Sequence, residues 1–88
     1  MSRNMEHCIV TSWQDEGTMC DNHLFCGHNK SSVAEEAEGY FKAIVMEDRP
    51  ATTEEELAVA LDDGWIDLGG GPCRYATISW PDITCLDH

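Results

Sequence analysis

The sequence predicts a single α+β domain, in which a small antiparallel sheet of three or four strands carries two helices on one face. Three observations predict this fold. The length of 88 residues suits one domain, spanning 1–88. Stretches rich in β-branched and aromatic residues lie near both ends of the chain. Between them, two segments open with the pattern of a helix-capping box.

The first part of the chain predicts two strands. Residues 8–13, with the sequence CIVTSW, are β-branched and aromatic, and the turn sequence QDEG follows them at 14–17. A second strand is expected over 18–20, or further on at 24–26. The stretch 20–30 is polar and rich in Cys, His and Asn, so it predicts a loop.

The first helix is expected to begin at Ser32, because Ser32 and Glu35 form a capping-box pattern. A strand over 40–47 is the alternative, since Ile44 and Val45 are β-branched. Pro50 ends the element, because the residue before a proline avoids helical backbone. The apolar residues that recur at helical spacing, and that favour the helix, are Val33, Ala37, Tyr40, Phe41 and Ile44.

The second helix has the clearest local signal. Thr53 and Glu56 form a capping box, and three glutamates in the first turn suit the positive end of the helix dipole. Gly64 is expected to end this helix in the left-handed conformation. Residues 65–68 predict a short strand, and residues 74–80 alternate between apolar and polar side chains, which predicts the last strand.

The charge of the chain excludes some functions. It carries 17 Asp and Glu against 5 Lys and Arg, a net charge of -12. Direct binding of nucleic acid is not expected, because phosphates need clustered cations. No apolar run approaches the roughly 20 residues that span a bilayer, and the first residues lack a signal-peptide pattern, so we expect a cytoplasmic protein without membrane contact.

Catalytic motifs are absent from the sequence. It contains no phosphate-binding loop, GxGxxG, HExxH, GxSxG or EF-hand pattern, and nothing pairs its carboxylates at a pocket. We therefore expect a binding protein and not an enzyme. A small thiol enzyme is the least favoured alternative, because the chain has no CxxC motif.

The acidic residues of the two predicted helices are the candidate partner-binding site. If both helices pack on one sheet face, their outer surfaces merge into one negative area, whose complement is a basic protein surface that binds nucleic acid. Binding there would block the partner by steric and electrostatic competition for its phosphate-binding cations. A merely solubilising or salt-adapted surface is the alternative. The candidate residues are Glu35, Glu36, Glu38, Glu54, Glu55, Glu56, Asp62 and Asp63.

In size, acidity and lack of catalytic motifs, the chain resembles the small inhibitors encoded by phages and mobile elements, such as anti-CRISPR proteins and DNA mimics. The resemblance lies in bulk character alone, and no motif of a particular family is matched. It implies an inhibitor of a nucleic-acid-handling protein, and it assigns no role to any residue.

The cysteines and histidines provide a second hypothesis, a small zinc-stabilised adaptor. Cys20, His23 and Cys26 lie close together in the sequence, and Cys73 could complete four ligands for a structural zinc ion. No other cofactor is expected. The alternative is that Cys73, like Cys8, is a small buried apolar residue. The odd count of five cysteines and the expected cytoplasmic location predict reduced thiols without a disulfide framework.

Overall fold

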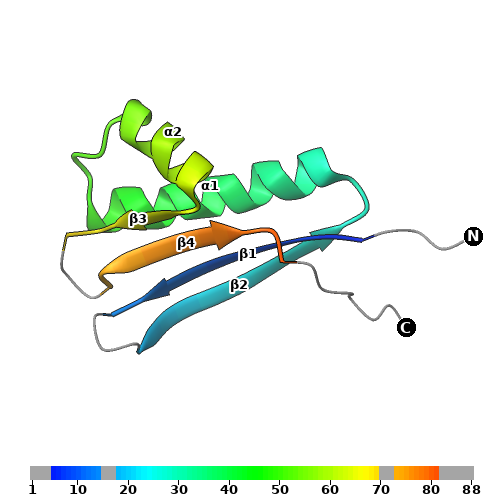
Figure 1. The fold of residues 1–88 in the computed structure, drawn as a ribbon, viewed down its shortest axis with the longest axis horizontal. Coiled ribbons are helices and arrows are strands. Elements are labelled where there is room, and N and C mark those ends of the chain that lie inside the picture. Colours follow the sequence, from blue (N-terminus) through cyan, green and yellow to red (C-terminus); the bar gives the residue numbers. More distant parts are fainter. Residues whose placement is uncertain (1–4, 15–17, 70–72, 82–88) are drawn as a thin grey trace, which may run out of the picture.

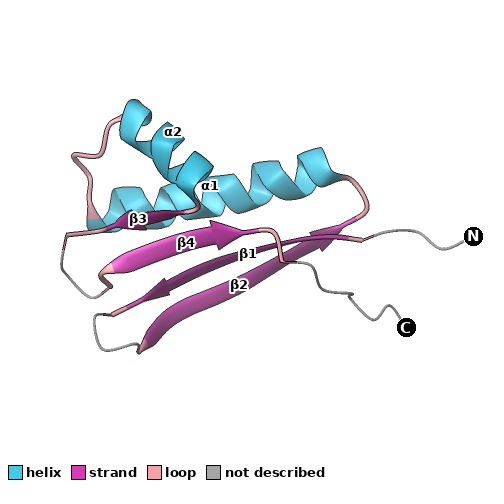
Figure 2. Cartoon of the chain, viewed as in Figure 1, coloured by secondary structure: helices cyan, strands magenta, loops and turns pink. Residues whose placement is uncertain are grey.

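The computed structural model describes residues 5–14, 18–69 and 73–81, and arranges them in two layers (Figure 1). A four-stranded antiparallel sheet has the strand order β2-β1-β4-β3, and both helices lie on one of its faces (Figure 2). The predicted α+β fold is therefore confirmed. The elements are β1 (Glu6–Trp13), β2 (Met19–Gly27), α1 (Lys30–Asp48), α2 (Glu54–Asp63), β3 (Trp65–Asp67) and β4 (Tyr75–Ser79).

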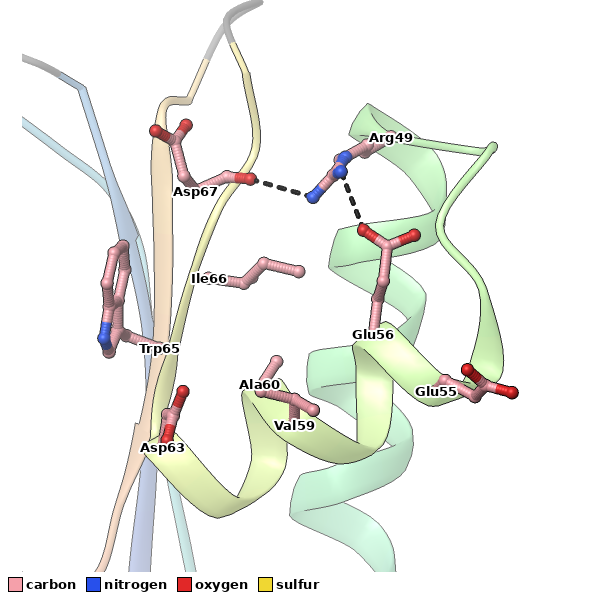
Figure 3. Close-up of a pocket in the computed structure, with 9 residues that line it drawn as sticks. All are labelled: Arg49, Glu55, Glu56, Val59, Ala60, Asp63, Trp65, Ile66 and Asp67. Carbon is pink, nitrogen blue, oxygen red and sulfur yellow. Dashed lines mark hydrogen bonds and ion pairs between the residues drawn. The ribbon is translucent and has the colours of Figure 1, made fainter.

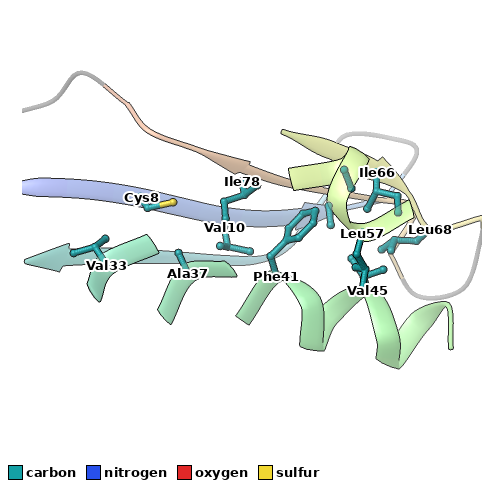
Figure 4. Packing of buried hydrophobic residues seen from close by; sticks show 12 residues of the cluster. Cys8, Val10, Val33, Ala37, Phe41, Val45, Leu57, Ile66, Leu68 and Ile78 are labelled. Carbon is teal, nitrogen blue, oxygen red and sulfur yellow. The ribbon is translucent and has the colours of Figure 1, made fainter. Parts of the chain in front are cut away.

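The core lies between the sheet and the helices (Figure 4). Cys8 and Val10 of the central strand β1 are fully buried there, and Ile9 between them points to the opposite face. Phe41 is the largest fully buried side chain, and burying a side chain of this size contributes about 1.5–3 kcal/mol. The buried residues of α1 recur every fourth position, which is the helical spacing expected from the sequence: Val33, Ala37, Phe41 and Val45.

Strand β2 corrects the prediction of a loop over 20–30. It runs without interruption from Met19 to Gly27 and pairs with β1 in the register Glu6↔Gly27 to Ser12↔Asp21. As an edge strand it leaves most of its side chains exposed, so a polar composition is tolerated. Its backbone hydrogen bonds to β1 stabilise it, and its own sequence contains no local pattern that predicts this pairing.

The start of α1 is also corrected. Asn29 is the N-cap residue, and its side-chain oxygen accepts hydrogen bonds from the backbone amides of Ser31 at 2.9 Å and Ser32 at 3.3 Å. The prediction of Ser32 as the cap is wrong by three residues. The rival strand over 40–47 is wrong as well, because the helix continues to Asp48 and ends before Pro50 as predicted.

Both predicted ends of α2 are confirmed. The Thr53 hydroxyl accepts from the Glu56 amide at 3.1 Å, and the Thr53 amide donates to the Glu56 carboxylate at 3.2 Å. Gly64 ends the helix with a φ of 82°, and a Cβ there would lie 3.1 Å from the carbonyl oxygen of Ile78. Because β3 starts at the next residue, these caps place α2 directly beside β3.

The expectation of reduced thiols without a disulfide is wrong for two cysteines. Cys20 and Cys73 form a disulfide with their Cα atoms 6.3 Å apart. The register of β1 with β2 shifts between Ser12 and Trp13, and the Arg74 amide donates to the Trp13 carbonyl at 2.9 Å. This contact places Cys73 beyond the end of β1 and next to Cys20. The spacing of the cysteines in the sequence does not predict that these two lie close together.

The predicted burial of Cys8 as a small apolar side chain is confirmed, since it has no exposed surface. Burial, and next the charge of Glu38, raise the pKa of the Cys8 thiol to about 11.

Within the described ranges, neither helix combines the length and the apolar character that crossing a bilayer requires.

Candidate functional site

A groove of about 450 Å³ lies between α2 and β3, at the edge of the sheet (Figure 3). One wall is formed by α2, the other by β3, and Arg49 closes one end. The groove belongs to the part of the chain that carries most of the predicted acidic residues. Its lining consists of Arg49, Glu55, Glu56, Val59, Ala60, Asp63, Trp65, Ile66 and Asp67.

The floor of the groove is apolar. Ala60 of α2 and Ile66 of β3 are buried beneath it, with 3% and 8% of their surface exposed. Val59 stands on the α2 wall with 60% of its surface exposed, although it is apolar. The groove therefore offers a patch on which the aliphatic part of a partner's side chain can be desolvated.

The rim of the groove is acidic. It carries three carboxylates, those of Glu55, Glu56 and Asp63, against the single guanidinium of Arg49. The Asp67 carboxylate points away from the groove and ion-pairs with Arg74 at 3.6 Å. In the described part of the chain, neither Glu55 nor Asp63 takes part in an ion pair. Carboxylates that lack a cation beside a low-polarity floor attract lysine and arginine side chains.

One guanidinium already occupies an end of the groove. Arg49 Nη2 donates to Glu56 Oε2 at 2.8 Å, and Nη1 donates to the backbone carbonyl of Asp67 at 3.4 Å (Figure 3). The backbone amide of Thr53 first, and then the Arg49 charge, hold the pKa of the Glu56 carboxyl below its usual range. The Arg49 contacts show how a cation binds at this place.

The structure divides the eight predicted acidic residues among four places. Glu55, Glu56 and Asp63 line the groove, and Asp62 is exposed on α2 outside the lining. Glu54 lies in the crease between the two helices, which Lys42 also lines.

The remaining three acidic residues, Glu35, Glu36 and Glu38, are on the first half of α1, before Lys42, which lines the crease beside α2. Glu36 precedes Tyr40 by one helical turn, and the Tyr40 hydroxyl donates to Asp21 of β2. Glu36 thus lies on the side of α1 toward β2, away from the groove. The cluster at α2 and β3 is therefore only part of the acidic surface expected from the sequence.

The four predicted zinc ligands are brought together only in part. Cys20 and Cys73 are bonded to each other. His23 stacks with Phe25 and Tyr40 on the helix side, with ring centroids 4.4 and 4.8 Å away. Cys26 is an odd number of residues from His23 in the same strand, so it points to the other face of the sheet. Across the ranges that the structure describes, no three His, Cys, Asp or Glu side chains are placed to hold a metal ion.

Several residues of the groove carry no functional prediction from the sequence, among them Arg49 and Val59. The sequence does contain a pattern that indicates an exposed role for Val59, because this residue is apolar but lies off the stripe formed by Leu57 and Ala60. Arg49 and the β3 residues have no such signal. They meet only when the chain brings α2 back onto the sheet edge.

The geometry of the groove is what supports a functional argument for this chain. Comparisons with models of protein families, with curated proteins and with solved structures found no match to it.

Proposed function

We propose that this protein binds a basic surface of a nucleic-acid-handling protein and blocks it. Its carboxylates would take the place of phosphates, and its bulk would exclude the nucleic acid. The observation that supports this function is the groove between α2 and β3, where three carboxylates and one guanidinium surround an apolar floor.

Two physical contributions act together in such a complex. The net charge of -12 attracts a basic surface over a distance of about a Debye length, which speeds the encounter and makes it sensitive to salt. The apolar floor then adds a contact that a phosphate backbone does not offer. Aliphatic stems of lysine or arginine would pack on Val59 and Ile66 while their charged ends reach the rim.

The first experiment identifies the partner and its loss of function. The immobilised protein captures proteins from a host lysate at low and at high salt, and each captured protein is tested for release of its nucleic acid in a mobility-shift assay. We expect a nucleic-acid-binding protein that is captured at low salt and loses its nucleic acid as this protein is added. Captured partners that keep their nucleic acid, or the capture of no such partner at low salt, would contradict the proposal.

A matched pair of double variants locates the binding surface. Glu55→Lys with Asp63→Lys changes the groove, whereas Glu35→Lys with Glu36→Lys changes the net charge equally on the exposed part of α1. Glu56 is left intact because it caps α2. We expect the groove variant to bind the partner at least about tenfold more weakly than the α1 variant. Equal affinities of the two variants would show that only total charge matters, and would overturn the assignment to the groove.

A further inference from the structure

We propose that the groove takes an extended basic segment of the partner, which adds to the sheet as a new strand along the free edge of β3. This inference rests on the proposed function and specifies how the partner is held. It combines three features: the unpaired edge of β3, the acidic groove on the helix side of this edge, and an aromatic pocket on the other side.

The register of β3 shows which backbone groups face outward. The Ile78 amide donates to the Gly64 carbonyl at 3.0 Å, and the Leu68 amide donates to the Arg74 carbonyl at 2.6 Å. With Ile66 opposite Ala76, this pattern makes the even-numbered residues of β3 bond to β4. The amide and carbonyl groups of Trp65 and Asp67 therefore point away from β4, toward the free edge.

One of these edge groups already accepts a hydrogen bond. The carbonyl of Asp67 receives the Arg49 Nη1 contact at 3.4 Å, as expected for an outward-facing oxygen. The Trp65 ring and the Asp67 carboxylate point away from the groove (Figure 3), so the β3 backbone itself borders it. Within the described residues, the Trp65 amide, the Trp65 carbonyl and the Asp67 amide have no partner at this edge. An extended chain laid along β3 would bond to them, as in other complexes formed by strand addition.

On the helix side, such a strand would meet the acidic rim. Glu56 and Asp63 are seven residues apart on α2, which is two turns and about 10 Å along the axis. Side chains two positions apart in a strand leave it about 6.7 Å apart, and lysine or arginine stems are long enough to cover the difference. Two basic residues at alternate positions of the segment therefore fit these two carboxylates.

On the opposite face, the intervening residue would meet aromatic rings. A pocket of about 250 Å³ lies there, lined by Trp13, Trp65, Tyr75 and Thr77. Trp65 is 51% exposed, and its ring centroid lies 6.2 Å from that of Tyr75. An apolar side chain suits this pocket. Three consecutive residues of the partner's segment would therefore be basic, apolar and basic.

The charge of the rim decides among possible occupants of the edge. A second copy of this chain would place its own three rim carboxylates against the first set, because pairing of two β3 edges brings the two grooves together. Like charges at such a contact are costly. A nucleic acid would be repelled in the same way, which leaves a basic peptide segment as the occupant.

The test uses a defined probe, a fluorescent peptide with the sequence Thr-Lys-Leu-Lys-Thr and blocked ends, bound to the intact protein at low salt. Each backbone amide of the peptide is methylated in turn, which removes one hydrogen-bond donor at a time. In an added strand only every second amide faces β3. We expect affinity to fall about tenfold on methylation at alternate positions and to change less than about twofold at the positions between. No binding, or equal sensitivity at neighbouring positions, would overturn the proposal.

Amide hydrogen exchange provides the readout on the protein. The peptide should slow exchange at Trp65 and Asp67, and should leave the other sheet edge, for example Leu24, unchanged; protection at both edges or at neither contradicts the added strand. If the peptide depends on Glu55 and Asp63 but shows no alternation, strand addition is wrong while the proposed function stands. Failure of the captured partner to release its nucleic acid would instead overturn the proposed function.

Discussion

Cys20 and Cys73 are joined across the end of β1, the strand that separates β2 from β4 in the sheet. The disulfide closes a loop of 53 residues, which includes both helices and β3. It therefore ties the start of β2 to the segment that enters β4. Arg74, the next residue after Cys73, ion-pairs with Asp67 at 3.6 Å, so this crosslink also lies close to the groove.

Removal of this disulfide should lower the free energy of unfolding substantially. For a loop of this length, the chain-entropy model gives about 4 kcal/mol, a large part of the stability of a small domain. Urea unfolding of the Cys20→Ser, Cys73→Ser double variant, compared with the oxidised protein, measures the loss. A reducing agent should destabilise the wild type and leave the double variant unchanged. Equal midpoints for the oxidised protein and the double variant would contradict the linkage.

The start of α1 is tested by two alanine substitutions. Because the Asn29 side chain accepts hydrogen bonds from two free amides of the first turn, Asn29→Ala should destabilise the protein by about 1 kcal/mol. Ser32→Ala should change stability by less than about 0.5 kcal/mol, since Ser32 is exposed inside the helix and alanine has the higher helix propensity. Thermal unfolding of both variants decides the matter, and a larger loss for Ser32→Ala would restore the sequence-based cap.

The difference between Asn29 and Thr53 shows what could be predicted from the sequence. The capping box of Thr53 and Glu56 and the left-handed Gly64 depend on residues within one turn, so local patterns reveal them. Asn29 and Ser32 both suit a cap, and local preference alone does not choose between them. The choice falls on Asn29 because β2 ends at Gly27, which is set by pairing with β1.

Only the negative charge of the groove could be predicted from the sequence. The glutamates of α2 could be read as an acidic face, but the second wall comes from β3 and the closing cation from Arg49, which bonds to a residue 18 positions away. The division of the acidic residues between the groove and α1 likewise follows from where α2 packs. The second wall, the position of Arg49 and this division all result from tertiary contacts, which composition and periodicity do not predict.

Burial of Cys8 predicts a specific pH dependence of stability. The pKa of this thiol is about 11 in the folded protein against 9.0 ordinarily, so between these values the unfolded chain loses a proton that the folded chain keeps. Unfolding is therefore favoured, and stability should decline as the pH rises from about 9 to about 11.

Cys8→Ala should show a shallower decline in urea unfolding measured across this pH range. The hydrogen bond to Asp21 also raises the pKa of Tyr40, but it is present in both proteins and cancels in the comparison. Parallel pH profiles for the variant and the wild type would show that the Cys8 thiol does not contribute.

Arg49 supplies the last prediction, because its guanidinium stands where a partner's cation would bind. Arg49→Met keeps the length of the side chain but frees the Glu56 carboxylate and the Asp67 carbonyl. The basic peptide should then bind several-fold more tightly, with a small loss of stability as expected for a half-exposed ion pair. Lys42→Met changes the net charge equally in the crease between the helices, away from the groove, and should leave peptide affinity nearly unchanged. Fluorescence titration of both variants measures the difference. Weaker binding by Arg49→Met would mean that this guanidinium holds α2 and β3 in place for the partner and does not compete with it.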